Sequence, residues 1–147
     1  KGIVQSENKI KIFIVDDDST YLKLLEIQFL KYPQFDVETF ETGESCIANL
    51  SKKPDIVVLD YYLNSVETTA INGLETLDKI KEIDSAIEVI MLSSQDKIEV
   101  AVKCLHHKAF DYVVKSETAF MRLLKIISSI SEMKQIEKKL NWYRDRM

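Results

Sequence analysis

Short apolar runs alternate along this chain with helical patterns, and this alternation constrains the fold more than any other feature. Five runs of five or six residues predict strands, at 10–15 (IKIFIV), 35–40 (FDVETF), 55–59 (DIVVL), 87–92 (IEVIML) and 110–114 (FDYVV). A helical pattern follows each run, and the last one continues to the end of the chain. Strands that alternate with helices at this spacing need crossover connections, which create a parallel sheet covered on both faces. We therefore predict an α/β protein with a doubly wound, five-stranded parallel sheet.

Composition narrows the class of protein. A chain of 147 residues, 46% hydrophobic and 30% charged, has the balance of one globular domain with at most a short appendage. Its net charge of -4 argues against direct nucleic-acid binding by this segment. No apolar run approaches the roughly 18 residues that span a bilayer, and the first residues lack a signal-peptide core, so we expect a cytoplasmic protein without membrane contact. Cys46 and Cys104 form neither a disulfide framework nor a metal-ligand spacing with His106 and His107.

Polar side chains follow four of the predicted strands at the point where each strand ends. They are Asp16, Asp17 and Asp18 after the first strand, Asp60 after the third, Ser93 and Ser94 after the fourth, and Lys115 after the fifth. Taken singly, an Asp or Ser at such a place is equally well explained as a helix cap, and a lysine as a solvated side chain. In doubly wound sheets, however, ligands bind beyond the carboxyl ends of the strands. If these strands are neighbours, the polar groups converge on one site.

The residue types at these strand ends favour phosphoryl chemistry. Clustered carboxylates repel one another unless a cation lies among them, and their hard oxygen ligands suit Mg²⁺. A carboxylate beside the metal can attack phosphorus and become an aspartyl phosphate. A lysine ammonium and a serine hydroxyl, together with the metal, can neutralise the phosphoryl oxygens. The pattern therefore predicts a phosphoryl-acceptor site.

Four segments of the chain, IFIVDDD, DIVVLD, VIMLSS and FDYVVK, resemble the receiver (CheY-like) domains of two-component response regulators. The resemblance runs over 10–131, which leaves 1–9 as an N-terminal tail and 132–147 as a C-terminal helical extension. It implies a flavodoxin-like (βα)5 fold with strand order 2-1-3-4-5. It also implies a signalling domain that takes a phosphoryl group from a sensor histidine kinase or a phosphotransfer protein and then changes its contacts, and that is not an enzyme for any separate substrate.

The resemblance assigns roles to individual residues. Asp60 takes the place of the phosphoacceptor, and Ser93 and Lys115 would hold the phosphoryl oxygens. Asp17, Asp60 and the backbone carbonyl of Tyr62 would coordinate Mg²⁺, with Asp16 acting largely through water. Ser93 and Tyr112 take the places of the two residues that switch on phosphorylation.

The chain departs from the family pattern at two places. Asn64 stands where a proline is usual, and the segment 64–72 (NSVETTAIN) delays a glycine to Gly73, so the loop after the third strand carries an insertion. This polar loop either shapes the choice of partner or is a tolerated surface insertion. Ser116 stands where a proline in a cis peptide is usual, and the sequence leaves the conformation of the Lys115–Ser116 peptide bond open.

Other functions fit the sequence less well. Asp16, Asp18 and Thr20 match the D-x-D-x-T arrangement of haloacid-dehalogenase-type phosphatases, in which Asp16 would be the nucleophile. Those enzymes need a hairpin-like flap directly after the motif, and they would leave Asp60 without a role. A receiver-like binding module without phosphorylation usually lacks the acceptor, a member of the acidic pair or the lysine, all of which are present here. A flavin site would require a phosphate loop rich in Gly and hydroxyl groups after the first strand.

The end of the chain predicts one long helix. No Gly or Pro follows Gly73, and a helix over 117–147 would extend about 45 Å at 1.5 Å per residue. Its first part carries a packing stripe of Leu123, Ile126 and Ile130. Beyond that stripe, apolar residues step by 3, 4, 3 and 4 in a heptad seam, namely Met133, Ile136, Leu140, Tyr143 and Met147. Two heptads favour equally a dimerising coiled coil, which would make a homodimer, and a linker or fraying tail.

Overall fold

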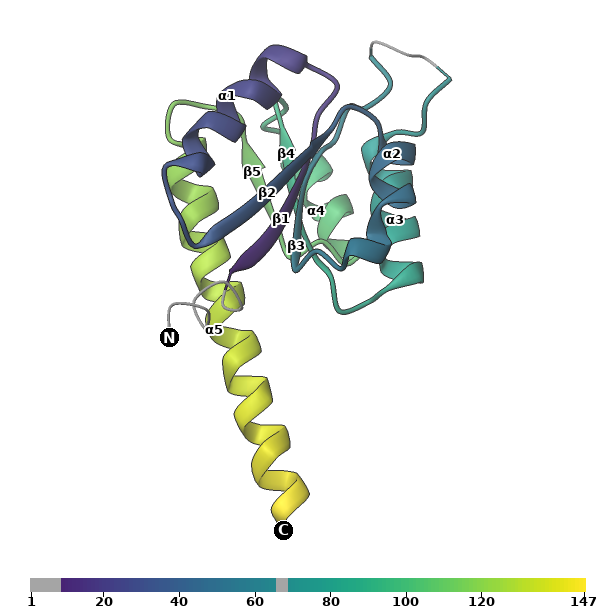
Figure 1. Ribbon diagram of the computed structural model, residues 1–147. Helices are drawn as coiled ribbons and strands as arrows, with labels where there is room; N and C mark the ends of the chain where they lie inside the picture. The colour runs from purple at the N-terminus through teal and green to yellow at the C-terminus, as the bar shows by residue number, and fades with distance from the viewer. Residues whose placement is uncertain (1–8, 66–68) are drawn as a thin grey trace.

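The computed structural model describes residues 9–65 and 69–147 and shows five parallel strands in the order β2-β1-β3-β4-β5 (Figure 1). The strands are β1 (Ile10–Val15), β2 (Phe35–Phe40), β3 (Ile56–Asp60), β4 (Glu88–Ser93) and β5 (Asp111–Val114). The helices are α1 (Ser19–Leu30), α2 (Gly43–Ala48), α3 (Gly73–Ile83), α4 (Ile98–His106) and α5 (Ala119–Arg146), with a 3₁₀ turn at Leu50–Lys52. The predicted fold class and strand order are confirmed. The predicted tail over 1–9 lies outside the described residues, except for Lys9.

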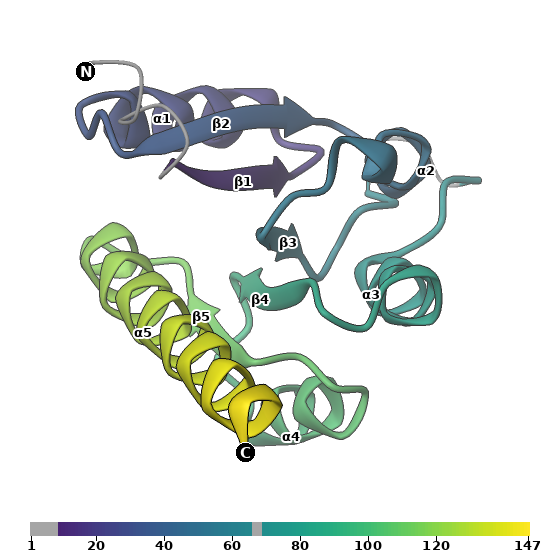
Figure 2. The same cartoon turned by 60° about the horizontal axis from the view of Figure 1, so that its bottom comes forward.

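Helices cover both faces of the sheet. Helices α1 and α5 lie on one face and α2, α3 and α4 on the other (Figure 2). Alternate strand residues point to the two sides, so Ile12 and Ile14 pack with α1 and α5, whereas Phe13 and Val15 pack towards the opposite helices. Strand β3 is buried over its whole length, as a strand covered on both faces requires. The half-polar β2 lies at an edge of the sheet, as its composition predicts.

The entry into α3 brings the chain close to the end of β3. Asn72 caps α3, and its side chain forms a reciprocal capping box with Glu75. At the first helical residue, Gly73, an added Cβ atom would lie 2.3 Å from the carbonyl oxygen of Asp60. Any side chain larger than hydrogen would therefore push α3 away from the carboxyl end of β3, which explains the glycine at this position.

Helix α5 continues far past the sheet (Figure 1). Its first part buries Ala119, Leu123, Ile127 and Ile130 in the core cluster that also holds residues of α1 and of strands β1, β3, β4 and β5. The predicted stripe was wrong at one position, because Ile127 and not Ile126 is fully buried; Ile126 lies at the edge of the contact and is only partly covered. The residues of the predicted heptad seam are all exposed. Among the described residues, no helix is long and apolar enough to cross a membrane.

Both cysteines belong to the core on the α2–α3–α4 side of the sheet. Cys46 and Cys104 are free and fully buried. Burial raises the pKa of the Cys46 thiol to about 12 and that of the Cys104 thiol to about 11, because a thiolate would be poorly solvated there. Their surroundings favour the unreactive thiol and a packing role.

Candidate functional site

Three carboxylates gather at the carboxyl edge of the sheet. Asp16 and Asp17 follow β1, and Asp60 ends β3, which is the neighbour of β1. One oxygen from each of the three carboxylates lies within 4.8 Å of the others. Asp16 is only 1% exposed and Asp60 only 4%, whereas Asp17 is half-buried. The parallel pairing of the two strands is what brings residues so distant in sequence together.

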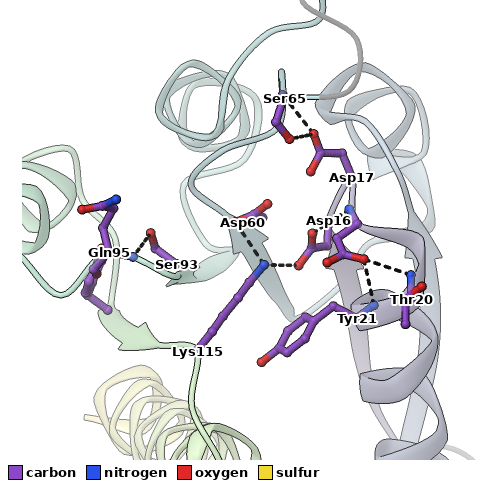
Figure 3. A network of polar contacts seen from close by, with 11 residues as sticks. Asp16, Asp17, Thr20, Tyr21, Asp60, Ser65, Ser93, Gln95 and Lys115 are labelled. Carbon is purple, nitrogen blue, oxygen red and sulfur yellow. Dashed lines mark hydrogen bonds and ion pairs between the residues drawn. The ribbon is translucent and has the colours of Figure 1, made fainter.

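Lys115 reaches this cluster from the end of β5. Its Nζ atom lies 2.9 Å from Oδ2 of Asp16 and 3.7 Å from Oδ1 of Asp60 (Figure 3). The ammonium also lies 4.5 Å from the ring centroid of Tyr21, on the first turn of α1. The predicted convergence of Asp16, Asp17, Asp60 and Lys115 is therefore present in the structure.

The electrostatics of the cluster show an excess of negative charge. Burial, and next the charge of Asp16, raise the pKa of Asp60 to about 8, although Lys115 opposes this rise. Burial alone would lower the pKa of Lys115, but its bond to Asp16 and the charge of Asp60 outweigh burial and raise it. One ammonium thus balances only part of the charge of three carboxylates. A divalent cation would balance the rest.

The third aspartate of the run has a structural role. Asp18 caps α1, because its Oδ1 atom accepts from the backbone N–H groups of Thr20 at 3.1 Å and Tyr21 at 3.2 Å. Its own N–H donates to Oδ1 of Asp16 at 2.9 Å and helps to orient that carboxylate. A dehalogenase-type site would require a hairpin-like flap directly after this motif. Helix α1 instead begins at Ser19, so the described chain has no such hairpin there.

Ser65, which the sequence analysis did not single out, contacts the cluster from the insertion after β3. Its hydroxyl donates to Oδ2 of Asp17 at 2.6 Å, and its backbone N–H donates to the same oxygen at 3.1 Å (Figure 3). On the other side of the insertion, the N–H of Ile71 donates to Oε2 of Glu44 at 3.0 Å. Residues 66–68 of the insertion lie outside the described residues. The signal in the sequence that could have pointed to Ser65 was the polar insertion in the loop that follows Asp60.

The two predicted switch residues are joined through the loop after β4. The fully buried Ser93 accepts from the N–H of Gln95 at 3.0 Å through its Oγ atom. The hydroxyl of Tyr112 donates to the carbonyl oxygen of the same Gln95 at 2.7 Å. The neighbouring Ser94 is exposed. Any displacement of this loop therefore acts on both side chains.

Two further predicted features lie beside the cluster. Hydrogen bonding from the Tyr62 backbone lowers the pKa of Asp60, an effect smaller than the rise caused by burial, while the coordination of a metal by the Tyr62 carbonyl stays a prediction. The Lys115–Ser116 peptide bond is trans.

Comparisons with known proteins agree with this geometry. The family model of the response regulator receiver domain matches residues 12–128. The transcriptional regulatory protein ZraR of Salmonella typhimurium is 30% identical over 107 residues, which are 73% of this chain and 23% of that protein. The protein-glutamate methylesterase/protein-glutamine glutaminase of Bacillus subtilis is 34% identical over 128 residues, or 84% of this chain and 34% of that protein. The crystal structure of NtrX from Brucella abortus superposes with a TM-score of 0.78 at 26% identity, covering 93% of this chain and 30% of that one. The chain thus spans about a third or less of the length of each of these relatives.

Proposed function

Because the chain belongs to the response regulator receiver domain family, we propose that it accepts a phosphoryl group on Asp60 from a sensor histidine kinase or a phosphotransfer protein. The observation that carries this proposal is the convergence of Asp60, the two aspartates after β1 and Lys115 at one edge of the sheet. Asp16 and Asp60 both combine deep burial with a neighbouring ammonium and two further acidic groups, and of these two the family pattern gives the acceptor position to Asp60.

The carboxylate cluster suits Mg²⁺. Three oxygens within 4.8 Å and a strongly raised pKa at Asp60 describe a site that gains by binding a hard divalent cation. Asp17, Asp60 and the carbonyl of Tyr62 would hold the ion, and Asp16 would act through water. When bound, Mg²⁺ would supply positive charge for the oxygens of the incoming phosphoryl group.

Phosphoryl transfer then depends on the groups around Asp60. A carboxylate oxygen of Asp60 forms a bond to phosphorus while the phosphorus–nitrogen bond of the donor phosphohistidine breaks. The imidazole keeps the electron pair of that bond and takes up a proton. Lys115, which already lies 3.7 Å from Asp60, and the hydroxyl of Ser93 at the end of β4 neutralise the charge on the phosphoryl oxygens. Attack requires the ionised carboxylate, so a cation that lowers the raised pKa of Asp60 also prepares the nucleophile.

The proposed output is a change of contacts. A phosphoryl group on Asp60 offers acceptor oxygens to Ser93, whose hydroxyl now accepts from Gln95. Moving Ser93 would disturb the Gln95 loop and hence Tyr112, altering the surface formed by α4, β5 and α5. The named relatives include a transcriptional regulator and a methylesterase, so this domain does not by itself indicate which output follows.

Mass measurement after incubation with acetyl phosphate and Mg²⁺ tests the acceptor. The unmodified chain should gain one phosphoryl group, and Asp60→Asn should gain none. Asp18→Asn is the matched control, because Asp18 caps α1 and should leave labelling intact.

Two results would contradict this function. Labelling that is abolished by Asp16→Asn but never found on Asp60 would favour the dehalogenase-type mechanism. A chain that gains no phosphoryl group from any small donor would instead be a binding module.

A further inference from the structure

Ser65 donates two hydrogen bonds to the Asp17 carboxylate. Its hydroxyl lies 2.6 Å and its backbone nitrogen 3.1 Å from one carboxylate oxygen, Oδ2. Hydrogen bonds of this kind to an ionised acceptor are short and about twice as strong as bonds between neutral groups. Two donors on one oxygen also restrict the rotation of the carboxylate.

The site needs such an orienting contact at Asp17 more than at its other two acids. Asp16 and Asp60 are nearly fully buried and both contact the Lys115 ammonium. Asp17 is the most exposed of the three carboxylates, so packing restrains its side chain least. A cation site binds tightly only when its ligands are held in place before the ion arrives.

We propose that Ser65 is a positioning residue of the cation site: it holds the Asp17 carboxylate in the orientation in which Asp17 shares a cation with Asp60. This inference rests on the proposed function, since it takes Asp17 as a metal ligand. It gives a role to the insertion 64–72, in which Ser65 is the second residue. The insertion therefore contributes a side chain that orients a ligand of the cation site.

The segment around Ser65 is anchored well enough for this role. The N–H of Gly73 donates to the carbonyl of Tyr61 at 3.1 Å, which ties the start of α3 to the end of β3. The bond from Ile71 to Glu44 ties the same segment to α2. Both bonds lie at the α3 end of the loop; at the β3 end, Leu63, two residues before Ser65, is fully buried in the core and fixes the chain next to Ser65.

Cation binding and the Ser65 contact should then support each other. If the contact strengthens Mg²⁺ binding by some factor, bound Mg²⁺ must strengthen the contact by the same factor. The bond from the Ser65 hydroxyl to Asp17 would therefore be formed for more of the time in the metal-bound domain than in the metal-free one. If the insertion were only a tolerated surface loop, Mg²⁺ binding and the Ser65–Asp17 contact would not affect each other.

Calorimetric titration of the full chain with Mg²⁺ tests the proposal. Ser65→Ala removes the hydroxyl and keeps the backbone N–H, and we expect it to weaken Mg²⁺ binding about tenfold. Ser65→Thr, which restores a hydroxyl, should recover most of the affinity. Ser85→Ala is the matched control, because Ser85 is an exposed loop serine between α3 and β4, at the opposite edge of the sheet.

A double-mutant cycle identifies the carboxylate through which Ser65 acts. In an Asp17→Asn background, Ser65→Ala should have no further effect on the remaining Mg²⁺ affinity. If Ser65→Ala binds Mg²⁺ as tightly as the unmodified chain, or if its effect is equally large without the Asp17 carboxylate, the positioning role is wrong. If the unmodified chain itself binds no Mg²⁺, the proposed metal site is wrong, and the inference about Ser65 is wrong with it.

Discussion

The carboxyl edge of the sheet and the free half of α5 depart from ordinary burial in opposite ways. At the sheet edge, Asp16, Asp60 and Lys115 are ionisable groups in largely buried positions. Along the second half of α5, apolar side chains such as Ile136 and Leu140 are 53% and 54% exposed. Proteins usually bury apolar groups and expose charged ones, because the opposite arrangement costs free energy.

Each departure indicates a contact that is made only part of the time. Buried carboxylates that repel one another gain from a cation and from a phosphoryl group that the ammonium can bind. An exposed apolar stripe gains from another apolar surface. The two regions differ in strength, however. The site is built from close charge contacts, so changing one group should have large effects, whereas the tail makes few contacts and should respond weakly.

The largest effect on Mg²⁺ affinity is expected when the metal ligand Asp17 is removed, and its neighbour Asp18 serves as the comparison. Asp17→Ala should weaken Mg²⁺ binding by about 100-fold, because the ion loses one of its few protein carboxylates and its charge. Calorimetric titration with Mg²⁺ measures this directly. Asp18→Ala should leave the affinity unchanged and instead destabilise the fold by about 1 kcal/mol, because only the cap of α1 is lost.

The converse result would break the contrast between these adjacent acids. If Asp18→Ala removes Mg²⁺ binding and Asp17→Ala does not, the ion is held by a different part of the acidic run. The assignment of Asp17 as ligand would then be wrong.

A second prediction uses the raised pKa of Asp60. In the metal-free fold this carboxyl has a pKa of about 8, against 3.8 as its ordinary value. Between these two pH values the folded chain holds a proton that the unfolded chain has released. Since stability falls with pH wherever the folded state binds more protons, the stabilising contribution is complete below about pH 4 and is lost as pH rises through about 8.

Asp60→Asn removes this dependence. In the presence of a chelator, the stability advantage of the variant over the unmodified chain should be larger at pH 9 than at pH 5 by an amount on the order of 4 kcal/mol, because each pH unit between 5 and about 8 contributes about 1.4 kcal/mol. Urea unfolding at both pH values measures the difference. Asp145→Asn, on the exposed end of α5, should show no such change with pH. Equal stability of Asp60→Asn and the unmodified chain at pH 9 would mean that the acceptor is not electrostatically strained.

Much of the fold and of the site could be predicted from the sequence, for a clear physical reason. Strand periodicity and burial on both faces are local signals, and they located all five strands to within about one residue. The rule that ligands lie beyond the carboxyl ends of parallel strands then brought Asp16, Asp17, Asp60 and Lys115 together. The individual role of Asp18 stayed undecided between cap and ligand until the geometry showed it donating to Asp16 and capping α1.

Contacts made by irregular segments could not be predicted in the same way. Ser65 lies in an insertion without periodicity, and its bonds to Asp17 depend on the course of a loop. The link from Ser93 through Gln95 to Tyr112 likewise depends on backbone atoms of a loop. The choice of Ile127 over Ile126 as the buried residue is finer than a 3.6-residue period resolves.

The smallest effect on stability is expected in the tail. Within the part of the chain that the structure describes, deleting 132–147 removes one hydrogen bond to the domain, from Lys134 Nζ to the carbonyl of Ala86 at 2.9 Å, and otherwise mostly exposed side chains. The free energy of unfolding should therefore change by less than about 1 kcal/mol.

Self-association of the chain should change more than its stability when the tail is deleted. Sedimentation of phosphorylated and unphosphorylated chains, with and without 132–147, should show that phosphorylation shifts the monomer–dimer equilibrium only when the tail is present. Ser93→Ala should still take up a phosphoryl group on Asp60, more slowly because one partner of the phosphoryl oxygens is lost, and the phosphorylated variant should not show that shift.

The charges beside the heptad seam allow a parallel pair of tails to be distinguished from an antiparallel one. If Met133 and Leu140 occupy the first position of their heptads and Ile136 the fourth, a parallel pair places Glu132 opposite the partner's Glu137, and Lys139 opposite the partner's Arg144. Both contacts are repulsive, so they weaken a parallel pair. An antiparallel pair that joins Met133 to the partner's Tyr143 instead brings Glu132 near the partner's Arg146. Glu132→Lys should therefore strengthen association of a parallel pair and weaken that of an antiparallel one. Association constants that are the same for this variant, for the truncated chain and for the unmodified chain would show that the seam binds no second copy and that the tail is a passive linker.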